Sequence, residues 1–245
     1  MRRNRGIIVA AVVAFGAILI ARLPASWVIP TGPKAAAGCA SLEGSLWSGA
    51  CGGLVLERQS IGDVSWELEP LRLLSGRLAA HVLLTRGASH ASADVELGFG
   101  GRVSARNVHS DLTLDPKVLP GLPDTLHGTA RVDLAEVELA RGALTQLKGR
   151  IEAHDLEDRS GNVTPLGSYV VSFPGGAGEP VGELRDLGGP LSVQGTVKLT
   201  RAGGYEVQGL LTPRAGASPE LLSNLRLLGS PDAAGRLPFG WSGTF

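Results

Sequence analysis

The stretch LSVQGTVKLTRAGGYEVQGLL, residues 191–211, decides the fold class of this chain. Apolar and polar side chains alternate from Leu191 to Leu199, and the alternation resumes at Tyr205 after a glycine-rich break at 201–204. A period of two places all the apolar side chains on one face of an extended strand. The stretch therefore predicts an antiparallel β-hairpin with one apolar face and one solvated face.

The same period recurs through most of the 245 residues. The clearest further runs are at 64–68, 78–84, 93–99, 130–134 and 147–153. At Ala135-Glu136 the phase slips by one residue, which indicates either a β-bulge or a turn. High glycine, with 35 residues, and few aromatic residues also favour short strands joined by turns. The sequence predicts an all-β domain, a curved antiparallel sheet of roughly ten strands shaped as an open groove or half-barrel.

Three other segments depart from this pattern. Residues 218–228 begin with Ser-Pro-Glu and continue with leucines at helical spacing, which predicts a short amphipathic helix packed on the sheet. The stretches 115–125 and 174–190 are rich in proline and glycine and are interpreted as loops.

The N-terminus, MRRNRGIIVAAVVAFGAILIARLPASWVIP, predicts a membrane anchor. Arg2, Arg3 and Arg5 precede an uncharged stretch from Gly6 to Ala21, which is about 24 Å long as a helix. Trp27 stands where an interfacial aromatic anchor belongs, and the arginines place the N-terminus in the cytoplasm. We expect a cytoplasmic segment 1–5, a transmembrane anchor 6–29 and a β-rich domain 30–245 across the membrane. A cleaved signal peptide, or a lipobox ending at Cys39, would deliver the same domain to the same side.

The charge balance and the motifs exclude several classes of function. Formal net charge is zero, and without the four arginines of residues 1–22 the chain has 19 basic against 23 acidic residues, so nucleic acid is not a partner. The five histidines lie singly, with no spacing typical of a zinc site. Asp155, Glu157 and Asp158 are interpreted as solvated turn residues rather than acid–base groups. No nucleophile elbow, P-loop or dinucleotide motif occurs, and we predict no enzyme activity, cofactor, metal or small-molecule substrate.

The two cysteines, Cys39 and Cys51, bracket the stretch CASLEGSLWSGAC. Two thiols alone cannot form a tetrahedral zinc site, and their spacing is not that of a redox motif. The compartment across the membrane is oxidising, so we predict a Cys39–Cys51 disulfide worth roughly 2–4 kcal/mol. It would hold Leu46 and Trp47 at the membrane-proximal end of the sheet.

Several short motifs together resemble the type II secretion system protein N family, also called general secretion pathway protein N. They follow the arginine-led anchor and comprise LEGSLWSG at 42–49, WELEP at 66–70, LLSGRL at 73–78, the stretch 189–205, LLGSPD at 227–232 and Gly235-Arg236. Their order and spacing carry the resemblance, while residues 85–180 match loosely.

The resemblance implies a single-pass protein of the cell inner membrane with a periplasmic β-rich domain. It implies an accessory, non-catalytic part of the machine that exports folded proteins across the outer membrane. The implied partners are the inner-membrane platform proteins C, L and M, the secretin, and membrane lipids.

Two mechanisms fit this sequence. In the first, the domain is a structural adaptor that binds partners through an unpaired sheet edge or its apolar face, with Leu46, Trp47 and Trp66 as candidate contact residues. Trp66 shares the parity of Val64 and Leu68, which favours a place in the core over a contact role. In the second, the concave apolar face is a lipid-binding or lipid-transfer groove, similar to AsmA/TamB-like periplasmic proteins.

Overall fold

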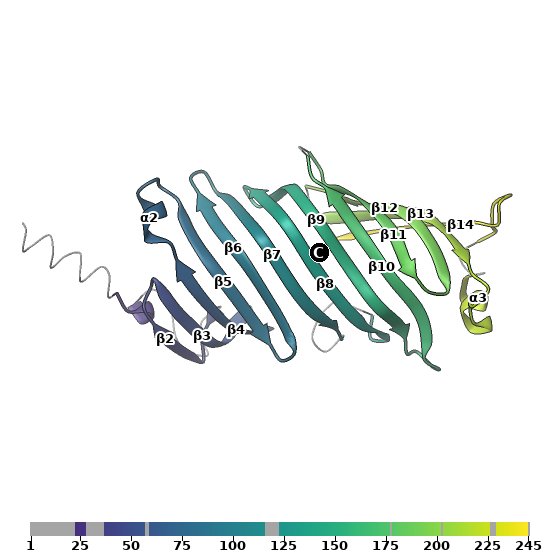
Figure 1. Cartoon of the computed structure of the whole chain (residues 1–245), viewed down its shortest axis with the longest axis horizontal. Coiled ribbons are helices and arrows are strands. Elements are labelled where there is room, and N and C mark those ends of the chain that lie inside the picture. The colour runs from purple at the N-terminus through teal and green to yellow at the C-terminus, as the bar shows by residue number, and fades with distance from the viewer. Residues whose placement is uncertain are drawn as a thin grey trace, which may run out of the picture. The chain divides into compact units, whose positions relative to one another are not determined.

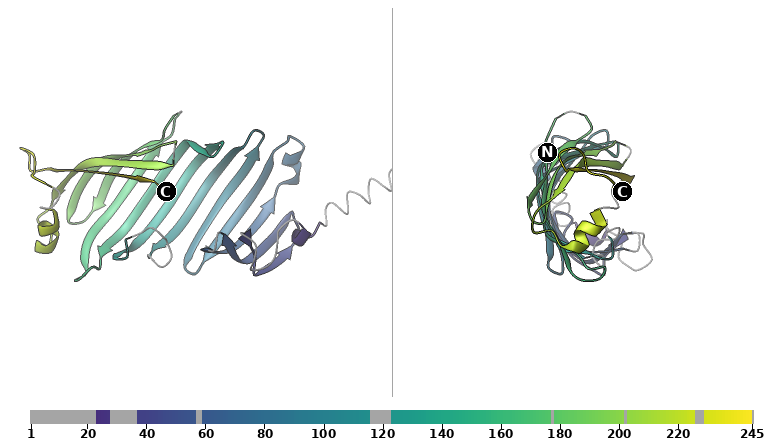
Figure 2. Two further views of the ribbon diagram at one scale, coloured as in Figure 1. Left: turned by 180° about the vertical axis from the view of Figure 1, so that it is seen from behind. Right: turned by 90° about the vertical axis from the view of Figure 1, so that its right-hand side faces the viewer.

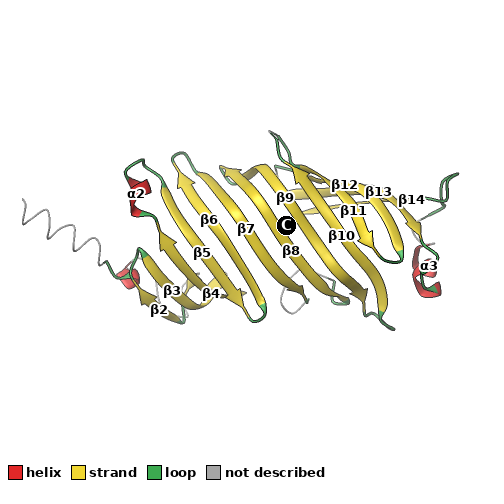
Figure 3. Cartoon of the chain, viewed as in Figure 1, coloured by secondary structure: helices red, strands yellow, loops and turns green. Residues whose placement is uncertain are grey.

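The structure, a computed structural model, describes residues 23–27, 37–56, 59–115, 123–176, 178–201, 203–225 and 229–244. These residues form fourteen strands and little helix (Figure 3). Residues 6–22 and 28–29 of the predicted anchor 6–29 lie outside them, as do Arg2, Arg3 and Arg5, whereas residues 23–27 of that anchor are described. Within the described ranges, no helix has both the length and the apolar character needed to span a bilayer. The chain divides into two compact units, Met1–Gly87 (unit 1) and Ala88–Phe245 (unit 2).

Unit 1 is an antiparallel sheet in which β2 and β1 both pair with one edge of β3, and β4 and β5 continue the sheet from its other edge (Figure 1). The elements are the 3-10 helix η1 (Ala25–Trp27), β1 (Ala37–Gly38), β2 (Ser41–Gly44), β3 (Ser48–Leu56), β4 (Gln59–Leu68), the helix α2 (Pro70–Leu73) and β5 (Leu78–Arg86). The alternation of Val64, Trp66 and Leu68 places them opposite Leu84, Val82 and Ala80 of β5, so both strands present their apolar side chains on one face.

Unit 2 is an antiparallel meander of nine strands, each paired with the next along the chain (Figure 1). The strands are β6 (Ser89–Gly98), β7 (Arg102–Leu114), β8 (Leu126–Ala140), β9 (Ala143–Asp158), β10 (Thr164–Pro174), β11 (Val181–Gly188), β12 (Leu191–Leu199), β13 (Gly204–Pro213) and β14 (Leu237–Thr244). The hairpin predicted from residues 191–211 is confirmed, with Val193 opposite Leu211 and Val197 opposite Val207. The phase slip is a β-bulge, because the register with β9 shifts between Leu134 and Glu136.

Two predictions about the strands were wrong. The described residues contain fourteen strands rather than roughly ten. The stretch 174–190 is not a loop throughout, since β11 occupies Val181–Gly188. Its side chains on the apolar face are Gly182, Leu184 and Asp186, a series with a single apolar side chain, so the alternation typical of a strand is absent from the sequence.

The strands of unit 2 share one apolar face, which we call the inner face. It carries two buried clusters. The first joins Leu134 of β8, Leu147 of β9 and Phe173 of β10. Val197 and Leu199 of β12 also pack against this cluster, so the sheet curves until β12 reaches the face of β8–β10 (Figure 2). Gly182 permits the curve, because a Cβ there would lie 2.8 Å from the Phe173 ring.

The second cluster is covered by the helix α3 (Pro219–Leu225), which lies on the hollow side of unit 2 (Figure 2). Its buried side chains, Leu221 and Leu225, pack against the buried residues Leu191, Val193, Leu211 and Leu237. The Ser218 hydroxyl accepts a hydrogen bond from the Leu221 amide at 3.1 Å and caps the helix. This confirms the predicted amphipathic helix on the sheet, although its residues 226–228 lie outside the described ranges.

A polar cluster beside the second apolar cluster joins β11, β12 and the turn between them to Arg214, which follows β13. The Arg214 guanidinium donates to Asp186 Oδ1 at 2.6 Å and to the carbonyls of Gly189 and Leu191, each at 3.1 Å. The Val193 amide donates to the other Asp186 oxygen at 3.0 Å. Burial raises the pKa of Asp186, but the hydrogen bonds from Arg214 and Val193 outweigh it and hold that pKa below its ordinary value.

We expect Asp186→Asn to lower the free energy of unfolding by about 1–2 kcal/mol at neutral pH, since it leaves Arg214 without its anion. The Asp186 side chain is only 12% exposed, while water screens the 41% exposed Arg214. A lowered folded-state pKa stabilises the fold above the unfolded pKa, and this stability is lost as pH falls through the folded pKa. The difference between wild type and variant in urea unfolding should therefore shrink in acid, below about pH 4.

The exposed pair Arg185–Glu183, with side chains 69% and 65% exposed, is the matched control. Glu183→Gln should leave the urea midpoint unchanged. A difference between wild type and Asp186→Asn that persists undiminished in strong acid would contradict the role given to the Asp186 charge.

Candidate functional site

The three predicted contact residues meet at the turn between β2 and β3. Trp66 of β4 donates its indole N–H to the Leu46 carbonyl at 3.0 Å, and the Leu68 amide donates to the Trp47 carbonyl at 2.6 Å. The Trp66 ring lies over Gly49, where a Cβ would be 2.6 Å from ring atom Cζ2. The glycine at 49 is therefore what allows the turn and the indole to approach each other.

All three side chains are half-buried. Trp66 uses its polar N–H inside unit 1, so most of its role is structural. Leu46 and Trp47 belong to the exposed turn itself and keep part of their surface accessible. The structure thus brings the predicted contact residues together, and it leaves Leu46 and Trp47 as the better placed of the three to touch a partner.

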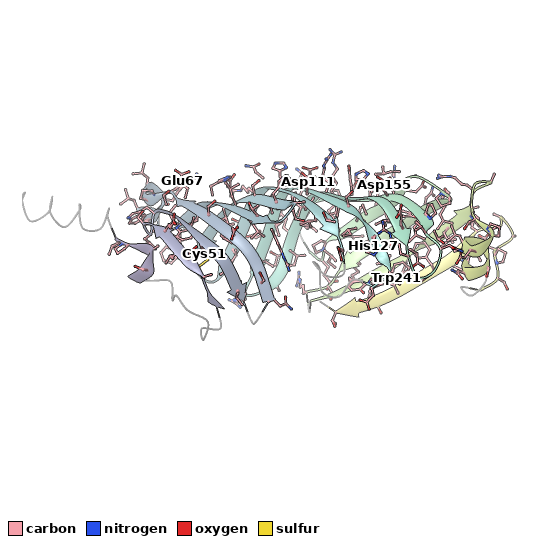
Figure 4. The ribbon with its side chains drawn as sticks, turned by 90° about the horizontal axis from the view of Figure 1, so that it is seen from below. Cys51, Glu67, Asp111, His127, Asp155 and Trp241 are labelled. Carbon is pink, nitrogen blue, oxygen red and sulfur yellow. A yellow bond between two sulfur atoms is a disulfide. The ribbon has the colours of Figure 1, made fainter. Side chains whose placement is uncertain are left out.

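The disulfide between Cys39 and Cys51 holds this turn against the sheet. Their Cα atoms are 5.4 Å apart, and both residues are buried, at 4% and 3% exposed. Cys51 lies on β3 opposite Val64, and Figure 4 shows its sulfur within unit 1. Because β1 has two residues and β2 has four, their own ladder hydrogen bonds are few. The disulfide is thus a main link between this edge and β3.

The described residues at the end of the predicted anchor also contact this turn. The Leu46 amide donates to the Leu23 carbonyl at 2.8 Å, and Pro24 forms an isolated bridge with Ser45. Ala25 is buried at 1% exposed, and Trp27 ends the 3-10 helix η1. The first described residues are therefore attached to the β2–β3 turn.

A shallow depression of about 440 Å³ adjoins the turn on unit 1. Trp66 lines it together with the acidic residues Glu43 and Glu67, and with His81 and Leu83. The depression is open to solvent, and its polar side chains come from the neighbouring strands β2, β3, β4 and β5. Such a surface can contact a partner, but it does not enclose a substrate.

The face of unit 2 opposite the inner face, the outer face, carries cross-strand ion pairs that the sequence did not reveal. Asp111 of β7 accepts from Arg131 of β8 at 3.0 Å and lies 3.2 Å from His90 of β6. The hydrogen bond from Arg131 lowers the pKa of Asp111. Further cross-strand pairs on this face are His109–Asp133 at 2.8 Å and Arg102–Glu138 at 2.9 Å. Exposed pairs of this kind contribute little stability, but opposite charges in register favour one strand pairing.

The acidic residues considered for acid–base chemistry lie at the end of β9 rather than in a turn. Figure 4 shows Asp155 and Asp111 on the outer face of unit 2. Glu157 pairs with Arg159 at 3.1 Å, and hydrogen bonds from Thr125 and Ser160 lower the pKa of Asp158. A carboxylate held ionised in this way is poorly suited to act as a general acid. Nowhere in the described ranges do three or more His, Cys, Asp or Glu side chains gather as a metal ion would require.

Two surfaces of unit 2 remain open. Among the described strands β14 pairs only with β13, and its Trp241 is 58% exposed and 5.4 Å from the Phe239 ring (Figure 4). On β6 and β7 the inner-face residues Val95 and Val103 are half-buried and Leu97 is 43% exposed, and none belongs to either buried cluster. Fold and site together define an all-β protein of open antiparallel sheets, in which unit 2 has one apolar face that is covered only in part.

The chain belongs to the type II secretion system protein N family. The family's sequence model, described as "Type II secretion system (T2SS), protein N", matches residues 35–240. Type II secretion system protein N of Aeromonas hydrophila is 27% identical over 242 residues, 94% of each chain. The protein of the same name from Vibrio cholerae serotype O1 is 27% identical over 213 residues, 82% of each chain. No solved structure matches. Membership confirms the resemblance and assigns the chain to type II secretion.

Proposed function

We propose that the protein is a non-catalytic structural subunit of the type II secretion system, anchored once in the inner membrane, with its β-rich domain in the periplasm. The anchor would be the part of the predicted segment 6–29 that precedes Leu23, because Leu23, Pro24 and Ala25 already contact unit 1. The observation that carries this proposal is the family match over residues 35–240, which spans strands of both units. The ion pairs of the outer face support it, since they join neighbouring strands across the surface of the sheet instead of converging in an enclosed cavity.

The subunit would act as an adaptor through two surfaces. Leu46 and Trp47, with the adjoining depression on unit 1, form one candidate contact. The edge of β14 forms the other, because an edge strand presents backbone donors and acceptors to which a partner can add a strand. The expected partners are the platform proteins C, L and M, with the secretin as a further candidate.

Site-specific photo-crosslinking in cells that secrete a type II substrate tests the adaptor. A photoreactive amino acid at Leu46, Trp47 or Trp241 should yield adducts with C, L or M, because these side chains are accessible on the two surfaces. Thr129, an exposed residue on the outer face of β8, is the control and should yield none. The adaptor role fails if none of the three positions gives an adduct and a strain lacking the protein secretes normally.

The uncovered part of the inner face favours a lipid-binding groove as the second candidate. Val95, Leu97 and Val103 form an apolar surface on β6 and β7 of unit 2 that could lie along acyl chains without any catalytic group. Native mass spectrometry of the purified full chain should then detect bound phospholipid, and Val103→Asp should abolish it. Lipid-free wild-type protein under the same conditions would rule this candidate out.

A further inference from the structure

The connection between β4 and β5 of unit 1, together with the first residue of β5, exposes four leucines. Leu71 is 79% exposed, Leu74 is 88% exposed, and Leu73 and Leu78 are 42% and 36% exposed. They occupy α2, the turn that follows it and the first position of β5, where the chain reads PLRLLSGRL from residue 70 to residue 78. We call residues 70–78 the leucine turn. Four exposed leucines lie within nine residues. Such a patch indicates a surface that contacts a membrane or another protein.

The leucine turn lies at the end of unit 1 where the predicted anchor joins. A backbone hydrogen bond joins Leu23 to Leu46, and a second joins Trp47 to Leu68. Leu68 lies two residues before the start of the leucine turn. Two strand spacings, about 10 Å, therefore separate the chain's entry point from the leucine turn. The polar headgroup layer on each side of a bilayer is about 5–8 Å thick. A membrane helix ending at Leu23 would hold this end of unit 1 within reach of that layer.

The charges of the leucine turn fit an anionic lipid surface. Arg72 and Arg77 lie between the leucines, and Glu69, which pairs with Arg72 at 3.1 Å, is the nearest acidic residue before them. A basic side chain beside an inserted leucine can bind a lipid phosphate while its aliphatic stem lies along the apolar layer. The same combination of exposed leucines and arginines is typical of interfacial membrane segments.

We propose that the leucine turn inserts into the headgroup layer of the membrane that holds the anchor, with Leu71 and Leu74 as the inserted side chains and Arg72 and Arg77 on lipid phosphates. The proposal rests on the proposed membrane anchor and adds a second contact with the same bilayer. Two contacts, the anchor and the leucine turn, fix the orientation of unit 1, since a single helix leaves it free to rotate about the anchor.

A fluorescent probe in the full chain tests this contact. Leu74→Cys is labelled with an environment-sensitive nitrobenzoxadiazole, and the protein is reconstituted in vesicles of equal phosphatidylcholine and phosphatidylglycerol. Insertion should shift the emission to the blue, and nitroxide-labelled lipid should quench it. Thr85→Cys, exposed on β5 and about 23 Å along that strand from Leu78, is the control and should show neither effect. Arg72→Gln with Arg77→Gln should weaken the quenching in these vesicles.

The outcomes separate this inference from the proposed anchor. Carbonate extraction reports on the anchor, and release of the wild-type chain into the supernatant would overturn both. A chain that stays with the membrane while the probe at residue 74 is neither shifted nor quenched would overturn the leucine-turn contact alone. A probe that is shielded only when the platform proteins are present, without quenching by lipid, would overturn it in favour of a protein contact.

Discussion

Replacing Phe173 with alanine should destabilise unit 2 by about 3–5 kcal/mol, the largest effect we expect from a single substitution in this protein. Phe173 is 4% exposed and packs with Leu134 and Leu147 at the centre of the first buried cluster. Its ring also lies over Gly182, so the space left by truncation cannot be filled from β11. For a unit of this size the loss corresponds to a Tm lower by roughly 10 °C, measured by circular dichroism of the strand signal.

Phe99→Ala is the matched control. Phe99 is 84% exposed in the connection between β6 and β7, so the same change in side-chain volume removes no buried contact. Its Tm should equal that of the wild type. Equal stability of Phe173→Ala and Phe99→Ala would show that β12 does not close over the face of β8–β10 and that the curvature of unit 2 has another cause.

Removing the disulfide by Cys39→Ser with Cys51→Ser should cost unit 1 about 3 kcal/mol, because the sequence separation of 12 closes a loop of intermediate size. This loss of stability should be confined to the edge of unit 1. Hydrogen exchange of amides in β1, β2 and the paired part of β3 should accelerate, while β7–β9 of unit 2 keep their protection, since no disulfide or ion pair of those strands is changed.

Reductant provides the internal control for this prediction. Wild-type protein treated with dithiothreitol should exchange like the double variant, and the double variant should not respond to dithiothreitol at all. If the two cysteine substitutions leave exchange in residues 37–56 unchanged, the edge of unit 1 is held by its ladder hydrogen bonds alone. The disulfide would then not be what fixes Leu46 and Trp47.

Much of the fold could be predicted because it follows from local alternation. The hairpin of β12 and β13, the bulge near Ala135 and the helix α3 each depend on residues close together in the chain. The Cys39–Cys51 pairing was predictable because only two cysteines exist. β11 could not be predicted, because Asp186 occupies a position on the apolar face and is stabilised there by Arg214, 28 residues later. α2 has four residues, too few for a periodic signal.

The candidate site was predicted in part. Leu46, Trp47 and Trp66 were named as separate candidate contacts, and the structure brings them together through a hydrogen bond from the Trp66 indole to a carbonyl 20 residues earlier. The outer-face ion pairs were missed because each joins residues on different strands, and their partnership depends on register. From the sequence, the leucines of the leucine turn would be expected in the core, because leucine is usually buried. Their exposure in the structure is what identifies them as a surface patch.

The sequence by itself determined that this protein is an antiparallel β-protein with one apolar face, that its two cysteines pair, and that it resembles the protein N family. Alternation depends only on residues that are neighbours in the chain, and two cysteines can form only one intramolecular disulfide. Only the tertiary structure decided which strands pair, where the sheet curves over Phe173, and which apolar side chains stay exposed at the leucine turn and on β6 and β7. Those properties depend on contacts between residues far apart in the chain, and burial is set by what packs against a side chain rather than by the side chain itself.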